Sequence, residues 1–577
     1  MLRVTPFAVL VAGCAASLPR PVLTTTAERS GYVRTGRYHE AVTLCRDFAR
    51  AYDGVTCVEI GSTIEHRPIV ALRIERTPGV PVIYIQAGIH AGEIEGKDAG
   101  FAFLRDLLDG KVAPGALDAV SVVFVPVMNP DGHERFGPNH RPNQRGPEQM
   151  GFRTNAARLN LNRDFVKADA PETQAVLRLI AASDPVLTLD LHTTDGAKFE
   201  HDISINAAPI APRSDRLDEA GNELSAAVAK RLTELGHLPV EFYPAFRNDE
   251  DPASGFARTE APPRFCQFYV AARSRLGILV ETHSWRSYRE RASSTYHTLQ
   301  AVFELARHQA RRWRSIELDA THADAKLAGT SVPMTWDAGP DSHPIAFRGY
   351  AYEKRVSELT GGTWLVYDET NPQVWTVPLF DQLVPAVTVR APAAGYIVDG
   401  GYASAVAAVL DRHGLTWNRI RDGAKLDVET FRATSVTFQP PYEGRTRAQL
   451  EGAWAREPRT LDRGAIFVPI AQPGARLVLH LFEPTLPDSL AQWGLFNTVF
   501  ERKEYMEPYV TEEAARAMIA RDPSVRAAFD AAVAADPAMA TSPTLKLEWF
   551  YRRHPAWDER LNLLPVYRAS SEPALVH

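Results

Sequence analysis

The chain has 577 residues, which is too long for one ordinary hydrophobic core and favours at least two domains. Hydrophobic residues make up 45% of it and charged residues 23%, the proportions of a globular protein rather than a disordered or fibrous one. The formal net charge of -6 offers no basic surface to a phosphate backbone, so we expect no nucleic-acid partner.

The first residues have the pattern of an export signal. A short basic start is followed by an apolar run over residues 4–12, and residues 10–14 read Leu-Val-Ala-Gly-Cys. This resembles the lipobox of bacterial lipoproteins. We therefore expect a lipoprotein-type signal peptide over 1–14 that is cleaved before Cys14 and leaves this thiol for lipid attachment. Ala15 follows where an Asp would retain the protein in the inner membrane, so we expect a periplasmic protein anchored to the outer membrane. An ordinary secretory signal with an incidental cysteine is the alternative.

The three remaining cysteines do not have zinc-finger spacing. Cys45 and Cys57 lie close enough in sequence to pair in an oxidising compartment, and two buried unpaired thiols are the alternative. Residues 15–34 are predicted to be a tether that leads into the first domain.

The first domain is expected over 35–315, and its first elements read as a helix over 38–52 and two strands over 55–60 and 69–74. The alternation of apolar and polar residues in these strands is typical of antiparallel strands at a sheet edge. A buried strand over 82–85 follows, and it leads through Gly88 towards an amphipathic helix.

His90 and Glu93 lie at the corner between that strand and that helix. An imidazole and a carboxylate three residues apart on one turn can bind the same cation. The alternative is a surface histidine beside a glutamate that complements the helix dipole.

Three later apolar runs also end in polar residues. Residues 120–128 lead into Asn-Pro-Asp-Gly, residues 186–191 lead into His192, and residues 277–280 lead into Glu281. Short Val- and Ile-rich runs between helical segments are typical of buried parallel strands. Reactive groups gather at the carboxyl ends of such strands, so we expect one shared site.

Two imidazoles and one carboxylate leave one open position on a tetrahedral Zn²⁺, the arrangement of catalytic zinc sites. Glu281 then fits a carboxylate that takes up and returns a proton. Arg153 and Arg163 are fixed cations; one can stabilise an oxyanion, and the other, beside Asn162, can hold a substrate carboxylate. The alternatives are a structural Glu281 paired with an arginine and surface salt bridges for the arginines.

The second half, 316–577, is predicted to be a β-rich α+β domain. Residues 331–400 are rich in Trp, Tyr and Val, a helix is expected over 402–413, and strands are expected over 464–470 and 476–482. Two short helices over 512–534 follow. This half shows no catalytic constellation, and its aromatic residues are more typical of a core than of a ligand platform.

The motifs of the first half together resemble the carboxypeptidase A-like zinc peptidase family over about 35–315. The matching residues, in chain order, are His90, Glu93, the Asn129–Gly132 stretch, Arg153, Asn162, Arg163, His192 and Glu281. The resemblance implies an α/β fold with a mixed, mostly parallel eight-stranded sheet flanked by helices.

The resemblance also implies roles for these side chains. His90, Glu93 and His192 would hold one zinc ion, and Glu281 would act as general base and acid. Arg153 matches the arginine on the oxyanion side, and the Asn162–Arg163 pair matches the groups that bind a C-terminal carboxylate.

Three positions depart from the family pattern. Gly92 stands where many members have an arginine next to the glutamate ligand, and Asn160 stands where an aspartate usually orients the first histidine. An amide can accept that hydrogen bond but adds no charge, so the metal would be held less tightly. The substrate-capping tyrosine of the family has no matching motif here; Tyr243 and Tyr269 are the candidates.

The resulting hypothesis is an exported zinc metallocarboxypeptidase that removes C-terminal residues from peptides, with cell-wall peptides as one candidate substrate. The second is a zinc amidase or N-acyl amino acid deacylase, because residues 192–195 (His-Thr-Thr-Asp) also resemble a stretch of those enzymes. The third is a non-catalytic binding lipoprotein whose site has decayed.

Overall fold

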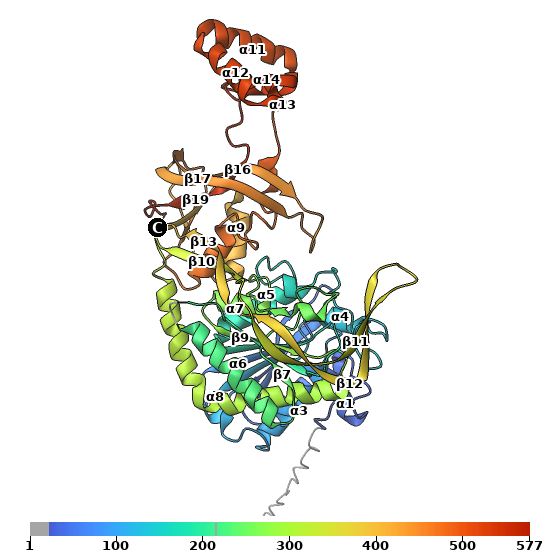
Figure 1. Ribbon diagram of the computed structural model, residues 1–577. Helices are drawn as coiled ribbons and strands as arrows, with labels where there is room; N and C mark the ends of the chain where they lie inside the picture. Colours follow the sequence, from blue (N-terminus) through green and yellow to red (C-terminus); the bar gives the residue numbers. More distant parts are fainter. Residues whose placement is uncertain (1–21, 214–215, 577) are drawn as a thin grey trace, which may run out of the picture.

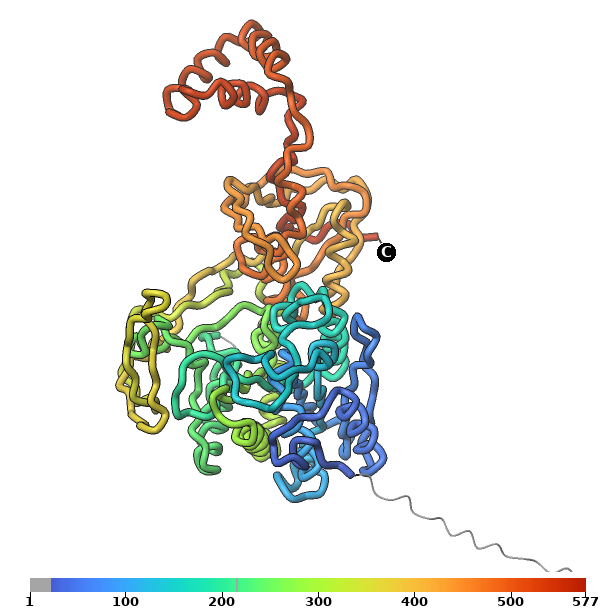
Figure 2. Tube along the Cα trace, turned by 90° about the vertical axis from the view of Figure 1, so that its right-hand side faces the viewer, coloured from blue at the N-terminus to red at the C-terminus, as the bar shows by residue number. Residues whose placement is uncertain are grey.

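The computed structural model describes residues 22–213 and 216–576, so the expected signal peptide and Cys14 lie outside the described residues. An α/β domain occupies one end of the molecule, β-rich sheets follow it, and a small helical bundle lies at the far end (Figures 1 and 2). No helix of the described part is both long and apolar enough to cross a membrane.

The α/β domain is built on an eight-stranded sheet with the order β1-β2-β4-β3-β5-β9-β6-β7. Its strands are β1 (Val55–Ser62), β2 (Pro68–Ile74), β3 (Val82–Ala87), β4 (Ser121–Val125), β5 (Leu187–Thr193), β6 (Ile203–Ala208), β7 (Pro239–Val240) and β9 (Leu276–Thr282). The central strands β4, β3, β5 and β9 pair in parallel, and β1, β2 and β6 pair antiparallel. The predicted mixed, mostly parallel sheet is confirmed.

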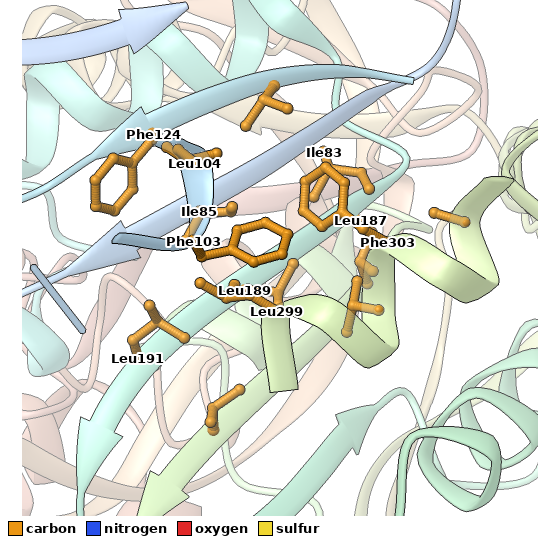
Figure 3. Close-up of a cluster of buried hydrophobic side chains, with 14 of the residues drawn as sticks. Ile83, Ile85, Phe103, Leu104, Phe124, Leu187, Leu189, Leu191, Leu299 and Phe303 are labelled. Atoms are coloured by element: carbon orange, nitrogen blue, oxygen red, sulfur yellow. The ribbon is translucent and has the colours of Figure 1, made fainter. Parts of the chain in front are cut away.

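Helices cover this sheet, and its central strands β5 and β9 are buried on both faces. The helices of the domain are α1 (Thr26–Arg29), α2 (Tyr38–Ala51), α3 (Glu95–Leu108), α4 (Pro130–Glu134), α5 (Pro171–Ser183), α6 (Leu217–Glu234), α7 (Cys266–Ala272) and α8 (Tyr288–Asp324). Ile83 and Ile85 of β3 pack with Phe103 of α3 and Phe303 of α8 on one face (Figure 3). Tyr84, between those isoleucines, faces the other side with α5 and α7.

A tether is expected over 15–34, but its described part, residues 22–34, includes a short helix that packs against the first domain. Thr25 caps α1 with a capping box, Ala27 is fully buried, and Glu28 forms an ion pair with Arg105 of α3 at 2.8 Å. The sequence of this segment is polar, and its one buried turn is held by contacts with a helix some 75 residues away, which local patterns do not reveal.

The expected domain boundary at 315/316 falls inside α8. This helix continues to Asp324 because Trp313, Ile316 and Ala320 still face the core of the α/β domain. The second region therefore begins after Asp324.

The second region is β-rich, as predicted, but it consists of several units. Its elements are β10 (Ser331–Ala338), β11 (His343–Val356), β12 (Thr363–Phe380), β13 (Leu383–Arg390), β14 (Gly395–Val398), α9 (Gly400–Arg412), β15 (Asn418–Arg419), β16 (Lys425–Phe438), β17 (Ala448–Thr460), β18 (Ile466–Pro469), α10 (Ala475–Phe482), α11 (Pro508–Arg521), α12 (Ser524–Ala535), α13 (Pro537–Thr541), α14 (Pro543–Tyr551) and β19 (Leu563–Ala569). The β11–β12 hairpin lies against the α/β domain, where β12 pairs with the two-residue strand β8 (Phe256–Ala257) (Figure 1).

The strand predicted over 476–482 is wrong, because this segment is the helix α10. Its two polar residues, Arg476 and His480, lie four positions apart, which is a helical spacing, but five of the seven residues over 476–482 are apolar. A run this short and this apolar also fits a buried strand.

Cys45 and Cys57 form a disulfide that joins the middle of α2 to β1, with an S–S distance of 2.01 Å. Cys266 is a buried free thiol. Of the two alternatives left by the sequence, the structure thus adopts the paired one.

Candidate metal centre and active site

The corner that carries His90 and Glu93 depends on two glycines, Gly88 and Gly92. After β3 the chain turns at Gly88 with φ +62°, a conformation that favours glycine, and the Glu93 N–H then donates to the His90 carbonyl at 2.9 Å. This turn sends both side chains to the carboxyl edge of the sheet, and α3 begins only at Glu95.

His90, Glu93 and His192 come together in one buried cluster. The Nδ1 atom of His90 lies 3.0 Å from Glu93 Oε1, and the Nδ1 atom of His192 lies 2.9 Å from Glu93 Oε2. One donor atom from each residue lies within 4.8 Å of the other two, and no side chain of the three is more than 5% exposed. Residues separated by about 100 positions therefore offer three ligands to one point.

The partners of the outer ring nitrogens show that the cluster suits a cation. His90 Nε2 lies 3.1 Å from Asn160 Oδ1, and His192 Nε2 lies 3.0 Å from Asp190 Oδ2. Each imidazole is thus held with Nδ1 towards the cluster, as the outer partners of zinc-bound histidines hold them. Two nitrogens, one carboxylate and an open side facing a cavity fit a catalytic zinc ion.

The charges of the cluster are strongly perturbed. Burial lowers the pKa of His90 to about 4, so this imidazole is neutral. Burial alone would raise the pKa of Glu93, but the Arg141 guanidinium and both imidazoles hold it well below its ordinary value. Burial also opposes the charge on His192, but Asp190 and Glu93 outweigh it and raise the pKa of His192.

Arg141 is the residue of this site that the sequence did not predict. Its Nη1 lies 2.9 Å from Glu93 Oε1, and its side chain is only 8% exposed. A Cβ on Gly92 would lie 2.6 Å from Arg141 Cγ and 2.8 Å from the Gly151 carbonyl oxygen. The missing side chain at position 92 thus makes room for a guanidinium from a distant loop.

Glu281 lies at the end of β9, directly beside His192 in the β5–β9 register. Its side chain is buried, its Oε2 has no hydrogen-bond partner, and burial raises its pKa to about 8. The structure therefore places a buried carboxyl with one unbonded oxygen next to the cluster, which is the environment of a group that exchanges protons near neutral pH.

The other predicted site residues line the same cavity of about 320 Å³. Arg153 is one-third exposed and lies 3.4 Å from Glu93 Oε1. Arg163 donates to the Asn162 carbonyl at 2.8 Å and stacks on the Phe265 ring at 4.2 Å. Asn160 stands just behind the cavity, where its Oδ1 also accepts the Asn162 N–H at 3.0 Å.

The two candidate tyrosines lie in different parts of the structure. Tyr243 lines the cavity beside Glu281, and burial together with the charges of Glu281 and Asp195 raises its pKa, so its hydroxyl stays protonated. Tyr269 lies in α7, is 2% exposed and hydrogen-bonds His413 Nδ1 at 3.0 Å. Tyr243 alone of the two reaches the site.

The second region also contacts the site. At the tip of the β16–β17 hairpin, Tyr442 accepts a hydrogen bond from Arg163 Nε at 3.1 Å, and Glu443 accepts one from the Asn160 N–H at 2.7 Å. Glu443 has φ +49° and is followed by Gly444 at φ +75°, the geometry of a tight hairpin turn. These partners lie some 280 residues away in sequence, and no motif marks them.

Comparison with known proteins finds a family match over part of the chain. Residues 42–245 match the sequence model of the zinc carboxypeptidase family. The chain is 31% identical over 125 residues to carboxypeptidase E of Caenorhabditis elegans, which is 20% of this chain and 26% of that protein. It is 32% identical over 170 residues to carboxypeptidase D of Homo sapiens, covering 27% of this chain and 12% of that protein. The matches thus span about a quarter or less of these relatives.

Solved structures with similar chains include two carboxypeptidases. A metallo-carboxypeptidase from Burkholderia cenocepacia is 19% identical with a TM-score of 0.36, and the match covers 46% of this chain and 68% of that one. Carboxypeptidase A from Helicoverpa armigera is 18% identical with a TM-score of 0.34, covering 50% and 74%. Residues 42–245, which match the sequence model of the zinc carboxypeptidase family, carry His90, Glu93 and His192.

Proposed function

We propose that the chain is a zinc-dependent metallocarboxypeptidase that removes C-terminal residues from peptides. The observation that carries this proposal is the convergence of the His90, Glu93 and His192 donor atoms within 4.8 Å, beside the unpartnered carboxyl of Glu281. A zinc ion held there activates water and polarises a carbonyl group.

The remaining steps belong to the side chains of the cavity. Glu281 takes up the proton released from the attacking water and returns it to the leaving amine, because its raised pKa suits it to both tasks. Arg153, at the mouth of the cluster, stabilises the oxyanion. Arg163, held flat against Phe265, and Asn162 bind the terminal carboxylate of the peptide.

The test is hydrolysis of a mixed peptide pool by the zinc-loaded protein, with products identified by mass spectrometry. We expect release of single C-terminal residues, loss of activity with a chelator and recovery with zinc. Release of an acyl group instead would favour the deacylase. No cleavage of any peptide or acyl amino acid by fully zinc-loaded protein would favour a binding protein and refute the proposal.

We also propose that the protein is exported and lipid-anchored through Cys14. The Cys45–Cys57 disulfide supports export, because disulfides persist in oxidising compartments. The test is the Cys14→Ser variant expressed in a bacterium. We expect the wild-type protein to incorporate labelled palmitate and to sediment with membranes, and the variant to do neither; an unlabelled wild-type protein would refute the anchor.

A further inference from the structure

The cavity is lined by apolar side chains such as Phe268 and Leu279 and also by several polar ones. The polar walls include Asn206 of β6, Arg258 and Thr259 just after β8, and Gln267 of α7. Gln267 is only 2% exposed, and its Oε1 is buried without a hydrogen-bond partner. A buried amide left unpaired costs free energy, so a substrate group that can hydrogen-bond Gln267 is favoured here.

Arg258 brings a positive charge to this pocket that no ion pair with a described residue neutralises. Its Nη2 donates to Asn222 Oδ1 at 2.9 Å, and its Nε is buried without a partner. Burial lowers the pKa of the guanidinium, and the charges of Glu241 and Asp381 oppose this shift only in part. A half-buried cation without a direct ion-pair partner can be stabilised by an anionic ligand.

The second region holds Arg258 in place. The Arg258 N–H donates to the Phe380 carbonyl at 2.8 Å, directly after β8 pairs with the end of β12. The backbone that carries the guanidinium is therefore held next to a strand pair. Such support keeps a charged group in a defined position relative to its ligand.

The charges around the cavity indicate a role for Arg258. Three arginines line it, and Glu281 is the one carboxylate among the residues that line it. Under the proposed function, Arg153 serves the oxyanion and Arg163 the terminal carboxylate, which leaves Arg258 for the substrate side chain. We infer that this carboxypeptidase selects peptides whose C-terminal residue carries a carboxylate side chain, aspartate or glutamate, bound by Arg258 and Gln267. The inference rests on the proposed function.

The experiment compares kcat/KM for four blocked dipeptides, benzoyl-Gly followed by Glu, Gln, Phe or Lys. We expect the wild-type protein to favour Glu over Gln, its neutral isostere, by roughly 10²-fold, the effect of one desolvated charge pair. Arg258→Met keeps the aliphatic stem and removes the charge, so it should bring Glu to the level of Gln while cleavage of the Gln substrate continues. Arg247→Met is the matched control, because Arg247 belongs to the same loop but stacks on Phe380 outside the cavity; it should keep the preference.

The outcomes separate the two proposals. Cleavage of Phe or Lys substrates with no preference for Glu leaves the carboxypeptidase intact and overturns the inference, as does an unchanged Glu preference in Arg258→Met. Cleavage of no dipeptide at all overturns the proposed function and the inference with it. Calorimetric binding of the Glu and Gln dipeptides to the zinc-loaded Glu281→Gln variant measures the same preference without turnover, and it should show the same ratio.

Discussion

Replacement of Glu281 by glutamine should abolish hydrolysis and at the same time stabilise the metal-free fold. Burial raises the pKa of this carboxyl from 4.5 to about 8, so the folded state resists its ionisation. At pH 7 the carboxyl is about 2.5 pH units above its ordinary pKa but still mostly protonated in the folded state. At 1.36 kcal/mol per unit, this lowers the free energy of unfolding by about 3 kcal/mol, and a neutral amide has no such cost. This cost is absent below pH 4.5, grows as the pH rises, and levels off above pH 8.

The assay is calorimetric unfolding of the metal-free wild-type and Glu281→Gln proteins at pH 5 and pH 8. We expect the variant to unfold at the higher temperature, by a margin that is larger at pH 8. In the zinc-loaded form its kcat should fall by about 10²- to 10⁴-fold, the contribution of a positioned general base.

Glu317→Gln is the matched control. Burial also raises the pKa of Glu317 to about 8, but its Oε1 accepts the Leu276 N–H at 3.0 Å, at the opposite end of β9 from Glu281. Its variant should retain activity. A Glu281→Gln protein that still hydrolyses peptides, or that is destabilised equally at both pH values, would refute the assignment of Glu281 as an unpaired proton carrier.

Three further predictions concern the cluster and the disulfide. His192→Ala should lower bound zinc from about one ion per chain to near zero in elemental analysis, and full retention would contradict the ligand assignment. Arg141→Met should destabilise the metal-free protein by about 3 to 5 kcal/mol in denaturant unfolding, because buried Glu93 loses the guanidinium at 2.9 Å. An unchanged denaturant midpoint would show that this ion pair contributes nothing to stability. Cys45→Ser with Cys57→Ser should cost about 3 kcal/mol, since the bridge closes a loop of 12 positions, and equal stability of reduced and oxidised wild-type protein would contradict this.

Several parts of the fold were within reach of sequence patterns because they depend on local periodicity. The parallel strands are short Val- and Ile-rich runs buried on both faces, and α9, α11 and α12 were predicted from composition and from the break at Asp522-Pro523. Patterns failed where an apolar run is too short to distinguish a helix from a strand, as in α10, and where a polar segment is held by distant contacts, as in 22–34.

The candidate site also contains residues that the sequence predicts and residues that it does not. Sequence patterns were enough to predict His90, Glu93, His192 and Glu281 as one set, because these residues lie at or shortly after the carboxyl ends of central strands and such ends share one edge of the sheet. The folded chain was needed to show which guanidinium supports Glu93, which tyrosine lines the cavity and which further cation does so. Those choices depend on loops and hairpins whose contacts span tens to hundreds of residues, and no local period or spacing encodes where such segments come to rest.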